Sequence, residues 1–352
     1  MKNHTLFSHN SPVFIIAEMS ANHGQNFDRA VKLVEAAHRA GADAIKLQTY
    51  TPDTITIDCD NDFFRIKGTI WDGRTLYDLY KEACTPWAWH KKLQTVATDL
   101  GLVFFSTPFD HTAVDFLEEL DVPCHKIASF ELVDLPLIKK VASTGKPVIM
   151  STGMASEAEI EEAVTTFKEA GGVELALLKC TSAYPAPPEE MNLKTIPYLS
   201  EKFNVVAGLS DHTLGTDIPI ASVAIGGRII EKHFCLSREQ GGPDTSFSLE
   251  PHEFKAMVDG VKRVEKAMGS VCFELTDKQK ESTAFRRSLF VTQNVAKGEF
   301  FSTDNVRSIR PGNGLHTRNL DSILGKQATM AVKKGTPFSW NFVGNDHGES
   351  EE

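Results

Sequence analysis

Eight short apolar runs alternate with amphipathic stretches between Val13 and Met268, and this alternation limits the folds open to the chain more than any other feature. We expect the runs to be β-strands: Val13–Glu18, Ala44–Thr49, Leu102–Ser106, Cys124–Ser129, Pro147–Ser151, Leu175–Cys180, Val205–Ser210 and Arg228–His233. The stretches between them have helical periodicity, as in Asp28–Ala40 and Glu157–Ala170. Eight consecutive strand–helix units predict a (β/α)8 TIM barrel, because a doubly wound sheet usually has fewer strands.

Glycines mark the ends of several expected helices. Gly41, Gly101, Gly145 and Gly171 each follow a helical pattern and precede a predicted strand. A glycine in this position commonly caps a helix C-terminus. The last helix of the barrel is expected at His252–Met268.

The alternation is interrupted in two places. Thr51–Thr85 is a long insertion rich in aromatic and charged residues; a loop of this length is usually functional, and its aromatic content argues against disorder. Beyond residue 272 a charged connector leads into short apolar triplets separated by Gly and Pro turns. We therefore expect four parts: a barrel of residues 1–272, a linker of residues 273–284, a small β-rich domain of residues 285–345 and an acidic tail of residues 346–352.

Charge and cysteine content narrow the range of partners and compartments. The formal net charge of −10 argues against nucleic acid or an anionic membrane surface as a partner, although a locally basic pocket can still hold an anionic substrate. The six cysteines are scattered without a paired spacing, which favours a reducing compartment. Neither a signal peptide nor an apolar run of membrane-spanning length is found, so we expect a cytoplasmic protein.

Two histidines stand at the ends of neighbouring predicted strands. His212 follows Val205–Ser210, and His233 ends Arg228–His233 one strand–helix unit later. Two imidazoles side by side at the carboxyl ends of parallel strands can hold one divalent metal ion with open coordination positions. A single histidine in such a position is more often structural, so the metal hypothesis depends on the polar residues at the other strand ends.

Strand parity places polar residues together at the carboxyl ends. Side chains two apart on a strand share a face, and on three strands the shared face is apolar first and polar last. These sets are Phe14, Ile16 and Glu18; Ala44, Lys46 and Gln48; and Ile229, Glu231 and His233. We expect the same mouth of the barrel to collect Lys126, Ser129, Ser151, Thr152, Lys179, Ser210 and His212.

Three of these residues are lysines, which are costly to bury without a partner. Lys46, Lys126 and Lys179, with hydroxyl groups around them, suit a phosphate or carboxylate ligand. A lysine at a strand end can also extend its ammonium group into solvent, and a Schiff-base role has no distinguishing mark in the sequence. The interpretation as an anion site therefore depends on the three lysines converging.

At these positions the chain resembles the sialic acid synthase family. The shared motifs are Ile16-Ala-Glu18, Asn22-His23, Lys46-Leu-Gln48, Lys126-Ile-Ala-Ser129-Phe-Glu131, Ser151-Thr-Gly-Met154, Gly208-Leu-Ser-Asp-His-Thr213, Glu231-Lys-His-Phe234 and Gly242-Pro-Asp244. The resemblance covers the whole chain and includes a C-terminal domain like the antifreeze-like (SAF) domain, with its segment from Arg310 to Gly314. It implies a TIM barrel followed by a small β-rich SAF domain.

Within the family the chain is most similar to the branch that makes pseudaminic acid. The similarity lies in the insertion from Phe63 to Tyr80 and in the loop Cys180–Pro187. Ser182 stands where synthases of neuraminic acid tend to carry Asn, which implies different contacts to the sugar. The implied reaction condenses phosphoenolpyruvate with the open-chain aldehyde of 2,4-diacetamido-2,4,6-trideoxy-β-L-altropyranose. It gives pseudaminic acid and phosphate, which makes the implied enzyme a transferase that forms a C–C bond.

The resemblance also implies roles for individual residues. Glu18 and Glu131 are the implied catalytic residues, and His212 and His233 the implied ligands of a divalent metal, Mn²⁺ or Mg²⁺, with Co²⁺ as a further alternative. The implied substrate-binding residues are Lys46, Gln48, Lys126, Ser129, Ser151, Ser182, Tyr184, Ser210, Asp244, Phe285 and Arg310. The implied assembly is a domain-swapped homodimer in which Arg310 reaches the sugar in the partner's barrel.

Other interpretations stay open at this point. Within the family, N-acetylneuraminate or legionaminate is the alternative product. A metal-dependent aldolase or hydrolase could use the same barrel, and phosphate release that depends on both phosphoenolpyruvate and sugar would distinguish a condensing synthase from it. An alternative of a different class is a non-catalytic protein whose C-terminal module binds a surface.

Overall fold

The computed structural model describes residues 6–344, which form two compact units. The first unit ends at Gly269 and the second begins at Ser270, close to the expected boundary after residue 272. Residue 345 and the expected acidic tail of residues 346–352 lie outside the described residues.

Eight parallel strands of the first unit close into a barrel. They are β1 (Phe14–Glu18), β2 (Ala44–Thr49), β3 (Val103–Pro108), β4 (His125–Ile127), β5 (Val148–Ser151), β6 (Leu175–Cys180), β7 (Val206–Asp211) and β8 (Ile229–His233). Each strand pairs with the next one along the chain, and β1 pairs with both β2 and β8. The ring therefore has no open edge, which removes the unpaired backbone groups of an open sheet.

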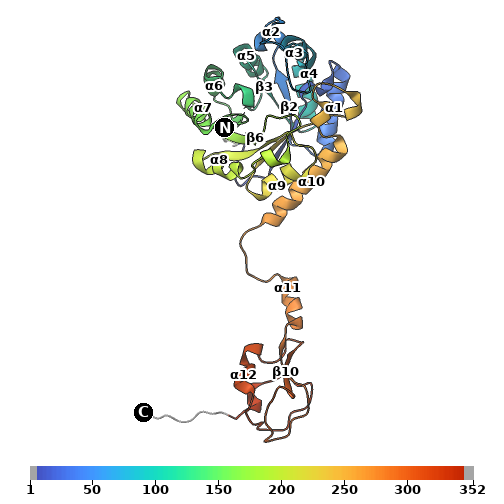
Figure 1. The fold of residues 1–352 in the computed structure, drawn as a ribbon, viewed down its shortest axis with the longest axis vertical. Coiled ribbons are helices and arrows are strands. Elements are labelled where there is room, and N and C mark those ends of the chain that lie inside the picture. The colour runs from blue at the N-terminus through green and yellow to red at the C-terminus, as the bar shows by residue number, and fades with distance from the viewer. Residues whose placement is uncertain (1–5, 345–352) are drawn as a thin grey trace. The chain divides into compact units, whose positions relative to one another are not determined.

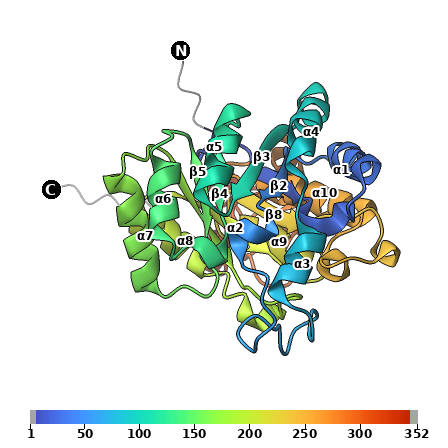
Figure 2. The same cartoon turned by 90° about the horizontal axis from the view of Figure 1, so that it is seen from above.

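Helices on the outside connect the strands. They are α1 (Phe27–Ala40), α4 (Trp87–Asp99), α5 (His111–Glu119), α6 (Leu135–Ala142), α7 (Glu157–Glu169), α8 (Thr195–Phe203), α9 (Asp217–Ala224) and α10 (Pro251–Met268). Figures 1 and 2 show these helices around the strands. The predicted (β/α)8 barrel is confirmed.

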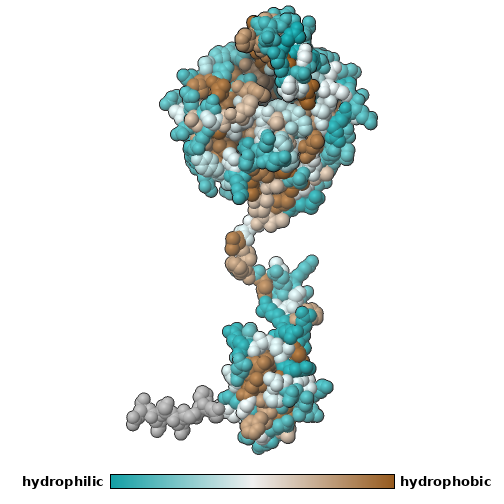
Figure 3. Space-filling view, viewed as in Figure 1, coloured by the Kyte–Doolittle hydropathy of each residue, from teal (hydrophilic) through white to brown (hydrophobic). Residues whose placement is uncertain are grey.

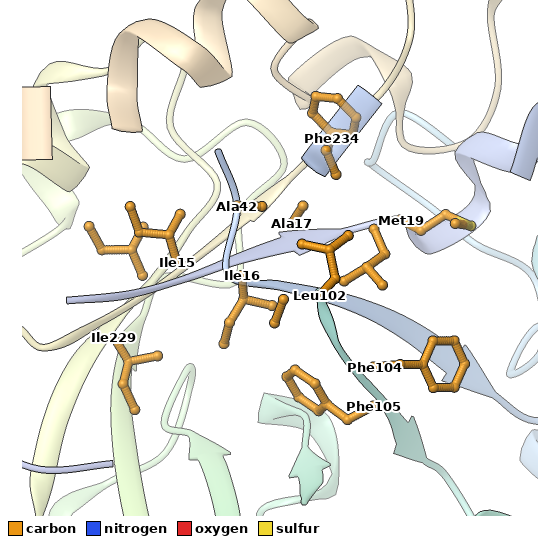
Figure 4. Packing of buried hydrophobic residues seen from close by; sticks show 14 of the residues in the cluster. Ile15, Ile16, Ala17, Met19, Ala42, Leu102, Phe104, Phe105, Ile229 and Phe234 are labelled. Atoms are coloured by element: carbon orange, nitrogen blue, oxygen red, sulfur yellow. The ribbon is translucent and has the colours of Figure 1, made fainter. Parts of the chain in front are cut away.

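The strands are apolar on both faces because side chains fill the barrel and helices cover it. Ile15 and Ile16 are adjacent in β1 and point to opposite faces, yet both are completely buried. Figure 4 shows them among other residues of the same core, including Phe104, Phe105 and Ile229. Apolar runs without polar alternation are thus what a strand covered on both sides requires.

The expected helix ends are confirmed at the four glycines. Gly41, Gly101, Gly145 and Gly171 have φ angles of 89°, 82°, 72° and 86°. These angles lie in the left-handed region, which other residues enter only at a steric cost. Gly41, Gly101 and Gly171 follow the ends of α1, α4 and α7 by one or two residues, whereas Gly145 follows the last residue of α6, Ala142, by three.

Six strands agree with their expected bounds to within one residue at each end, and the structure corrects the other two by more. The run Cys124–Ser129 contains only the three-residue strand β4, because the chain turns at Ala128 into a 3₁₀ helix of Ser129–Glu131. In contrast, β3 continues to Pro108, two residues beyond the expected end at Ser106. Ser129 and Glu131 therefore lie on a short helix beyond the strand end.

The insertion Thr51–Thr85 is partly helical. It contains α2 (Pro52–Ile55) and α3 (Leu76–Ala83). Within the loop between them, Arg65 and Thr75 form an isolated antiparallel β-bridge. Thr75 caps α3, since its side chain accepts a hydrogen bond from the N–H of Asp78. Figure 2 shows this loop, in blue, extending beyond α3.

The second unit is small and rich in turns. Its regular elements are α11 (Asp277–Ser282), the antiparallel strands β9 (Ser288–Val291) and β10 (Val306–Ile309), and α12 (Leu320–Ile323). Isolated bridges such as Phe290–Pro337 and Val295–Val332 extend the pairing, and Leu289, Val291 and Phe301 belong to a separate core. The predicted small β-rich domain is present.

Two large apolar side chains are exposed in the segment after the barrel. Val271 and Phe273, in the segment between α10 and α11, are 92% and 94% exposed, and Figure 3 shows hydrophobic colour over this segment. Among the described residues, every helix is too short or too polar to cross a membrane.

Candidate active site

Four charged side chains meet inside the barrel toward the carboxyl ends of the strands. Lys46 Nζ lies 2.6 Å from Glu18 Oε2 and 3.6 Å from Glu231 Oε1. Lys126 Nζ lies 3.9 Å from the same oxygen of Glu231. None of the four residues is more than 6% exposed. We call Glu18, Lys46, Lys126 and Glu231 the charged cluster; its two ammonium groups and two carboxylates balance in formal charge.

Burial shifts the pKa values in the charged cluster. It raises the pKa of Glu18 to about 7, with Lys46 opposing and Glu231 adding to the effect. Burial lowers the pKa of Lys46, but the carboxylates of Glu18 and Glu231 raise it by more, so Lys46 keeps its proton. Burial lowers the pKa of Lys126. Glu18 is therefore a group that can gain or lose a proton near neutral pH.

Hydroxyl groups stand beside both lysines. Lys126 Nζ donates to Ser151 Oγ over 2.7 Å, and Lys46 Nζ donates to Thr107 Oγ1 over 3.0 Å. The sequence predicts Ser151 here but misses Thr107, because the predicted third strand ends one residue before it. The parity rule applied to the full length of β3 would have found it, since Phe105 and Thr107 share a face.

Ser129 and Ser182 converge on the peptide of Gly153. The N–H of Gly153 donates to Ser129 Oγ over 3.1 Å. A Cβ atom on Gly153 would lie 2.7 Å from Ser129 Oγ and 2.3 Å from Ser182 Oγ, so any larger residue would displace both hydroxyls. Two predicted substrate-binding hydroxyls, from different loops, are thus held beside one backbone amide.

A chain of hydrogen bonds leads from Glu18 to the loop after β8. Gln48 Nε2 donates to Glu18 Oε1 and to Ser20 Oγ, each over 3.0 Å. Ser20 Oγ in turn donates to Asp244 Oδ2, which also accepts from the N–H of Ala21. The predicted residues Gln48 and Asp244 are therefore linked through Ser20, which the sequence analysis missed although it stands two residues after Glu18.

The two histidines lie side by side at the ends of β7 and β8. Their ring centroids are 5.3 Å apart. His212 Nδ1 lies 3.0 Å from the carbonyl oxygen of Thr181 and must donate to it, which leaves Nε2 with the lone pair. Burial holds the pKa of His233 well below its usual range. Burial also lowers the pKa of His212, but the neighbouring Cys180 and the Thr181 carbonyl raise it by more.

This arrangement fits a divalent metal ion. A carbonyl that orients one ring nitrogen of a histidine is the usual support for a metal-bound imidazole. His233 Nδ1 is buried without a hydrogen-bond partner among the described residues. Within residues 6–344 no group of three or more His, Cys, Asp or Glu side chains is placed to hold a metal, so the chain offers two ligands for it.

Aromatic rings form a wall next to the histidines. The ring centroid of Tyr184 lies 4.4 Å from that of His212 and 5.1 Å from that of Phe247. The ring centroids of Phe247 and His233 are 4.9 Å apart. Trp71, from the insertion, lies 5.8 Å from Tyr184 and donates its Nε1–H to the carbonyl oxygen of Pro243. Tyr184 was expected here. Trp71 was expected to contribute apolar surface of the insertion to the sugar site. Phe247 was not named as a site residue, and nothing in the sequence spacing links it to the histidines.

Two further predicted residues lie in the same region. Glu131 is largely buried, and burial raises its pKa to about 7 against the effect of Lys126. Its Oε2 has no hydrogen-bond partner among the described residues. Ser210 is buried on β7 and pairs in register with Cys180 on one side and Glu231 on the other.

The structure does not bring every expected residue into the site. Lys179 was expected at the mouth, and this was wrong: its Nζ donates to the Cys180 carbonyl oxygen over 2.6 Å and to Thr181 Oγ1 over 3.2 Å. Cys180 is the residue of β6 that contacts His212, and its neighbour Lys179 points to the opposite face. Thr152 is buried and its hydroxyl donates to the carbonyl oxygen of Leu178, which is a structural contact.

Phe285 and Arg310 belong to the second unit. Phe285 is 67% exposed at the end of a short 3₁₀ helix, and Arg310 is exposed before Pro311. Their roles as substrate contacts stay predictions.

A separate cavity of about 530 Å³ lies at the other end of the strands. Val13, Asp43 and Leu102 contribute to its wall, where the first three strands begin. Asp43 accepts a hydrogen bond from the N–H of Ile15 over 2.8 Å. Residues at this end of a TIM barrel serve stability, whereas the chemistry is found at the carboxyl ends.

Comparison with known proteins identifies the class of this protein. Residues 33–272 match the NeuB family, and residues 286–343 match the SAF domain. The chain belongs to the NeuB family, which confirms the resemblance to the sialic acid synthases.

Individual relatives match over almost the whole chain. A pseudaminic acid synthase of Campylobacter jejuni is 46% identical to it, covering 94% of this chain and 96% of the relative. An N,N'-diacetyllegionaminic acid synthase of the same species is 39% identical, covering 91% and 97%. The crystal structure of an N-acetylneuraminic acid synthetase from Leptospira borgpetersenii, in complex with citrate, aligns with a TM-score of 0.69 at 34% identity. This alignment covers 78% of this chain and 90% of that one.

Proposed function

We propose that this protein condenses phosphoenolpyruvate with the open-chain aldehyde of 2,4-diacetamido-2,4,6-trideoxy-β-L-altropyranose, giving pseudaminic acid and phosphate. The identity of 46% with a pseudaminic acid synthase supports the choice of product. The observation that carries the proposal is the charged cluster. A barrel without a ligand to bind has no reason to bury two lysines and two glutamates at its reactive end.

Phosphoenolpyruvate would bind at the lysines. Lys46 and Lys126 supply two positive charges, and Ser151 and Thr107 supply hydroxyls already bonded to them. The negative charge of a bound anion would then neutralise the two ammonium groups together with the carboxylates of Glu18 and Glu231.

The bond changes would take place above the cluster. The enol carbon of phosphoenolpyruvate attacks the aldehyde carbon, water adds at the adjacent carbon, and the C–O bond to the phosphate breaks. Glu18, with its pKa of about 7, would accept the proton from water, and Glu131 is placed as a second carboxyl for proton transfer. General acid–base catalysis of this kind contributes about 10²–10⁴-fold to a rate.

His212 and His233 would hold Mn²⁺ or Mg²⁺. When bound, the metal supplies Lewis-acid polarisation of the aldehyde oxygen. Two imidazoles alone bind such hard ions weakly, so substrate oxygens and water would complete the coordination. The Thr181 carbonyl, which accepts from His212 Nδ1, would keep the ring oriented for this purpose.

The sugar would lie between the histidines and the aromatic wall. Tyr184, Phe247 and Trp71 offer an apolar surface that suits a 6-deoxy sugar, whose terminal carbon is a methyl group. Gln48, Asp244 and Ser182 would take the polar groups of the substrate. Ser210 lies in register between Cys180 and Glu231 and would border the phosphoenolpyruvate side.

A homodimer is part of the proposal. Val271, Phe273 and Phe285 are exposed apolar residues next to or within the second unit, and exposed apolar surface commonly marks an interface. In a domain-swapped dimer, Arg310 and Phe285 of one chain would complete the sugar site of the other. We also propose that the protein acts in the cytoplasm, where phosphoenolpyruvate is available.

A mass-spectrometric assay tests the proposal. The purified chain with Mn²⁺ is incubated with phosphoenolpyruvate labelled with ¹⁸O at the bridging position, and with one sugar at a time. The panel contains the altrose-type sugar, the sugar precursor of legionaminate, and N-acetylmannosamine. We expect a nine-carbon keto acid from the first sugar and the label in phosphate, because C–O cleavage leaves the bridging oxygen on phosphorus.

Each alternative gives its own result in this assay. Preferred turnover of the second or third sugar would change the product assigned, and the 39% identity with a legionaminic acid synthase makes the second the principal competitor. Phosphate release without sugar would indicate a hydrolase, and no turnover would indicate a binding protein. Activity that survives a chelator at full rate would contradict the metal site.

A further inference from the structure

A completely buried ion pair adjoins the two histidines in the chain. Asp211 precedes His212 at the end of β7, and Lys232 precedes His233 at the end of β8. Asp211 and Lys232 are partners in the strand register, and Lys232 Nζ lies 2.5 Å from Asp211 Oδ2. Both side chains have no exposed surface. They are separate from the charged cluster, because Lys232 and Glu231 are adjacent on the strand and face opposite ways.

The same pair holds the turn that follows β7. Asp211 Oδ1 accepts from the N–H of Thr213 over 3.1 Å, and Asp211 Oδ2 accepts from the Thr213 hydroxyl over 3.0 Å. Lys232 Nζ also donates to the carbonyl oxygen of Thr213. His212 therefore lies between Asp211 and Thr213, which both contact the ammonium group of Lys232. Lys232 directly precedes His233.

From this geometry we infer that Asp211 and Lys232 are positioning residues for the metal ligands His212 and His233. The ion pair ties the backbone on both sides of one histidine to the side chain next to the other. It thereby sets the distance and orientation of the two imidazoles, which a metal site requires to within about 0.5 Å. The inference rests on the proposed metal site, and concerns two residues that touch neither metal nor substrate.

A purely structural role predicts something different. Replacing both members of a buried ion pair with apolar residues of similar size is often neutral or stabilising, whereas removing one member leaves a buried charge unpaired. The double variant Asp211→Leu/Lys232→Met therefore separates the two roles. A structural pair would leave a folded double variant with normal metal affinity, but a positioning pair would leave it folded with weakened affinity.

The experiment measures three properties of the full-length, metal-free chain. Mn²⁺ binding is followed by the electron paramagnetic resonance signal of free Mn²⁺, phosphoenolpyruvate binding by calorimetry without metal, and folding by thermal unfolding. We expect the double variant to bind Mn²⁺ about 10–100-fold more weakly, as when outer partners of metal ligands are lost. Its affinity for phosphoenolpyruvate should stay unchanged, because the charged cluster is intact.

A matched control lies at the other end of β8. Arg228→Met removes the ion pair of Arg228 with Glu265, whose atoms are 3.4 Å apart, and should leave Mn²⁺ affinity unchanged. Should the double variant fail to fold, Asp211→Asn/Lys232→Met also removes both charges but keeps the shape of the Asp211 side chain, and should still weaken Mn²⁺ binding. Normal Mn²⁺ affinity in either folded double variant overturns the inference.

The proposed metal site is tested separately in the same series. Wild-type protein should bind one Mn²⁺ per chain, and His212→Ala/His233→Ala should bind none. If that variant binds as the wild type does, the proposed site is wrong and the inference falls with it. If it loses binding while the ion-pair variants keep it, only the inference is wrong.

Discussion

Glu18 and Glu231 are buried and Glu131 is partly buried, and the surroundings of these three carboxyl groups of the first unit differ. Glu18 lies 2.6 Å from an ammonium group and accepts a hydrogen bond from Gln48. Glu231 contacts both Lys46 and Lys126. Glu131 has one oxygen without a hydrogen-bond partner among the described residues. Because these environments differ, substitutions of the same kind should have different effects.

Glu18→Gln should reduce kcat by about 10²-fold or more, with a modest change in KM. Gln keeps the shape of the side chain but cannot accept a proton. In the wild type, kcat/KM should increase as pH rises through about 7, the pKa of Glu18 in the free protein, because the base is the ionised form. Steady-state kinetics between pH 5.5 and about 8.5 would check both points. A normal kcat with a raised KM would indicate that Glu18 binds substrate only.

Glu131→Gln should stabilise the protein at alkaline pH and not at acidic pH. Burial raises the pKa of Glu131 from 4.5 to about 7, so folding favours its protonated form. The protonated Glu131 therefore contributes fully to the stability of the folded protein below pH 4.5, its pKa in the unfolded chain. This contribution is lost as pH rises through about 7, its pKa in the folded protein. Thermal unfolding should show a Tm advantage of about 2–4 °C for each kcal/mol regained at pH 8. The advantage should vanish at pH 4.5; an equal difference at both pH values would contradict the shift.

At the scale of elements, the insertion between β2 and α4 is fixed at several points. Trp71 donates to the Pro243 carbonyl oxygen and packs on Tyr184. At its other end, Thr85 Oγ1 lies 3.1 Å from His23 Nε2 of the first loop. The insertion is therefore attached to the loops after β1 and β8, and Trp71 brings it into contact with Tyr184. These attachments make it an ordered part of the site region.

Trp71→Ala should reduce discrimination between the altrose-type sugar and N-acetylmannosamine, because the methyl group of the 6-deoxy sugar loses an apolar contact. One methyl group is worth about 1–3 kcal/mol of discrimination, or roughly 10–200-fold. The ratio of kcat/KM for the two sugars measures the effect. Phe63→Ala is the matched control, since Phe63 belongs to the same insertion but is 91% exposed. An unchanged ratio in Trp71→Ala would reject a role of the insertion in specificity.

At the scale of the whole molecule, the two units have separate cores. Among the described residues, the core of the second unit consists of ten buried apolar residues, and Val343 is one of them. A domain of this size gains little stability alone, and its exposed Phe285 and Arg310 have no role within it. A dimer that covers these two exposed residues would bring both into contact with the partner chain.

Mixing two impaired chains tests this dimer, with the sugar kept well below its KM so that a raised KM lowers the rate. Arg310→Ala should raise the sugar KM roughly tenfold or more, because a hydrogen bond from a charged group is worth about 1.5–3 kcal/mol. His212→Ala should abolish metal-dependent turnover. A mixed dimer contains one site with both residues, so equal mixing with random exchange should restore roughly a quarter of wild-type activity. Chains that exchange subunits, shown by mass spectrometry of the mixture, yet never complement would contradict the dimer.

Local pattern was sufficient for much of this protein. The period of the apolar residues predicts the order and type of the barrel elements, and strand parity predicts that Glu18, Lys46 and Glu231 share the inner face. Both follow from backbone geometry over a few residues. Thr107 was missed because β3 is longer than predicted. Lys179 was wrong because parity was not applied to β6, on which Cys180 takes the inner face.

Distances across the barrel were decided by the tertiary structure alone. The strands β2 and β8 lie on either side of β1. Only closure of the ring curves the sheet enough to bring Lys46 on β2 within 3.6 Å of Glu231 on β8. Lys126 on β4 stands four strands from β8 and reaches Glu231 through the interior. The aromatic wall likewise joins Trp71 to Tyr184 and Phe247, which come from separate loops. The sequence determines which face each residue takes, because that depends on the local backbone; the closed barrel determines which residues meet, because that depends on every strand at once.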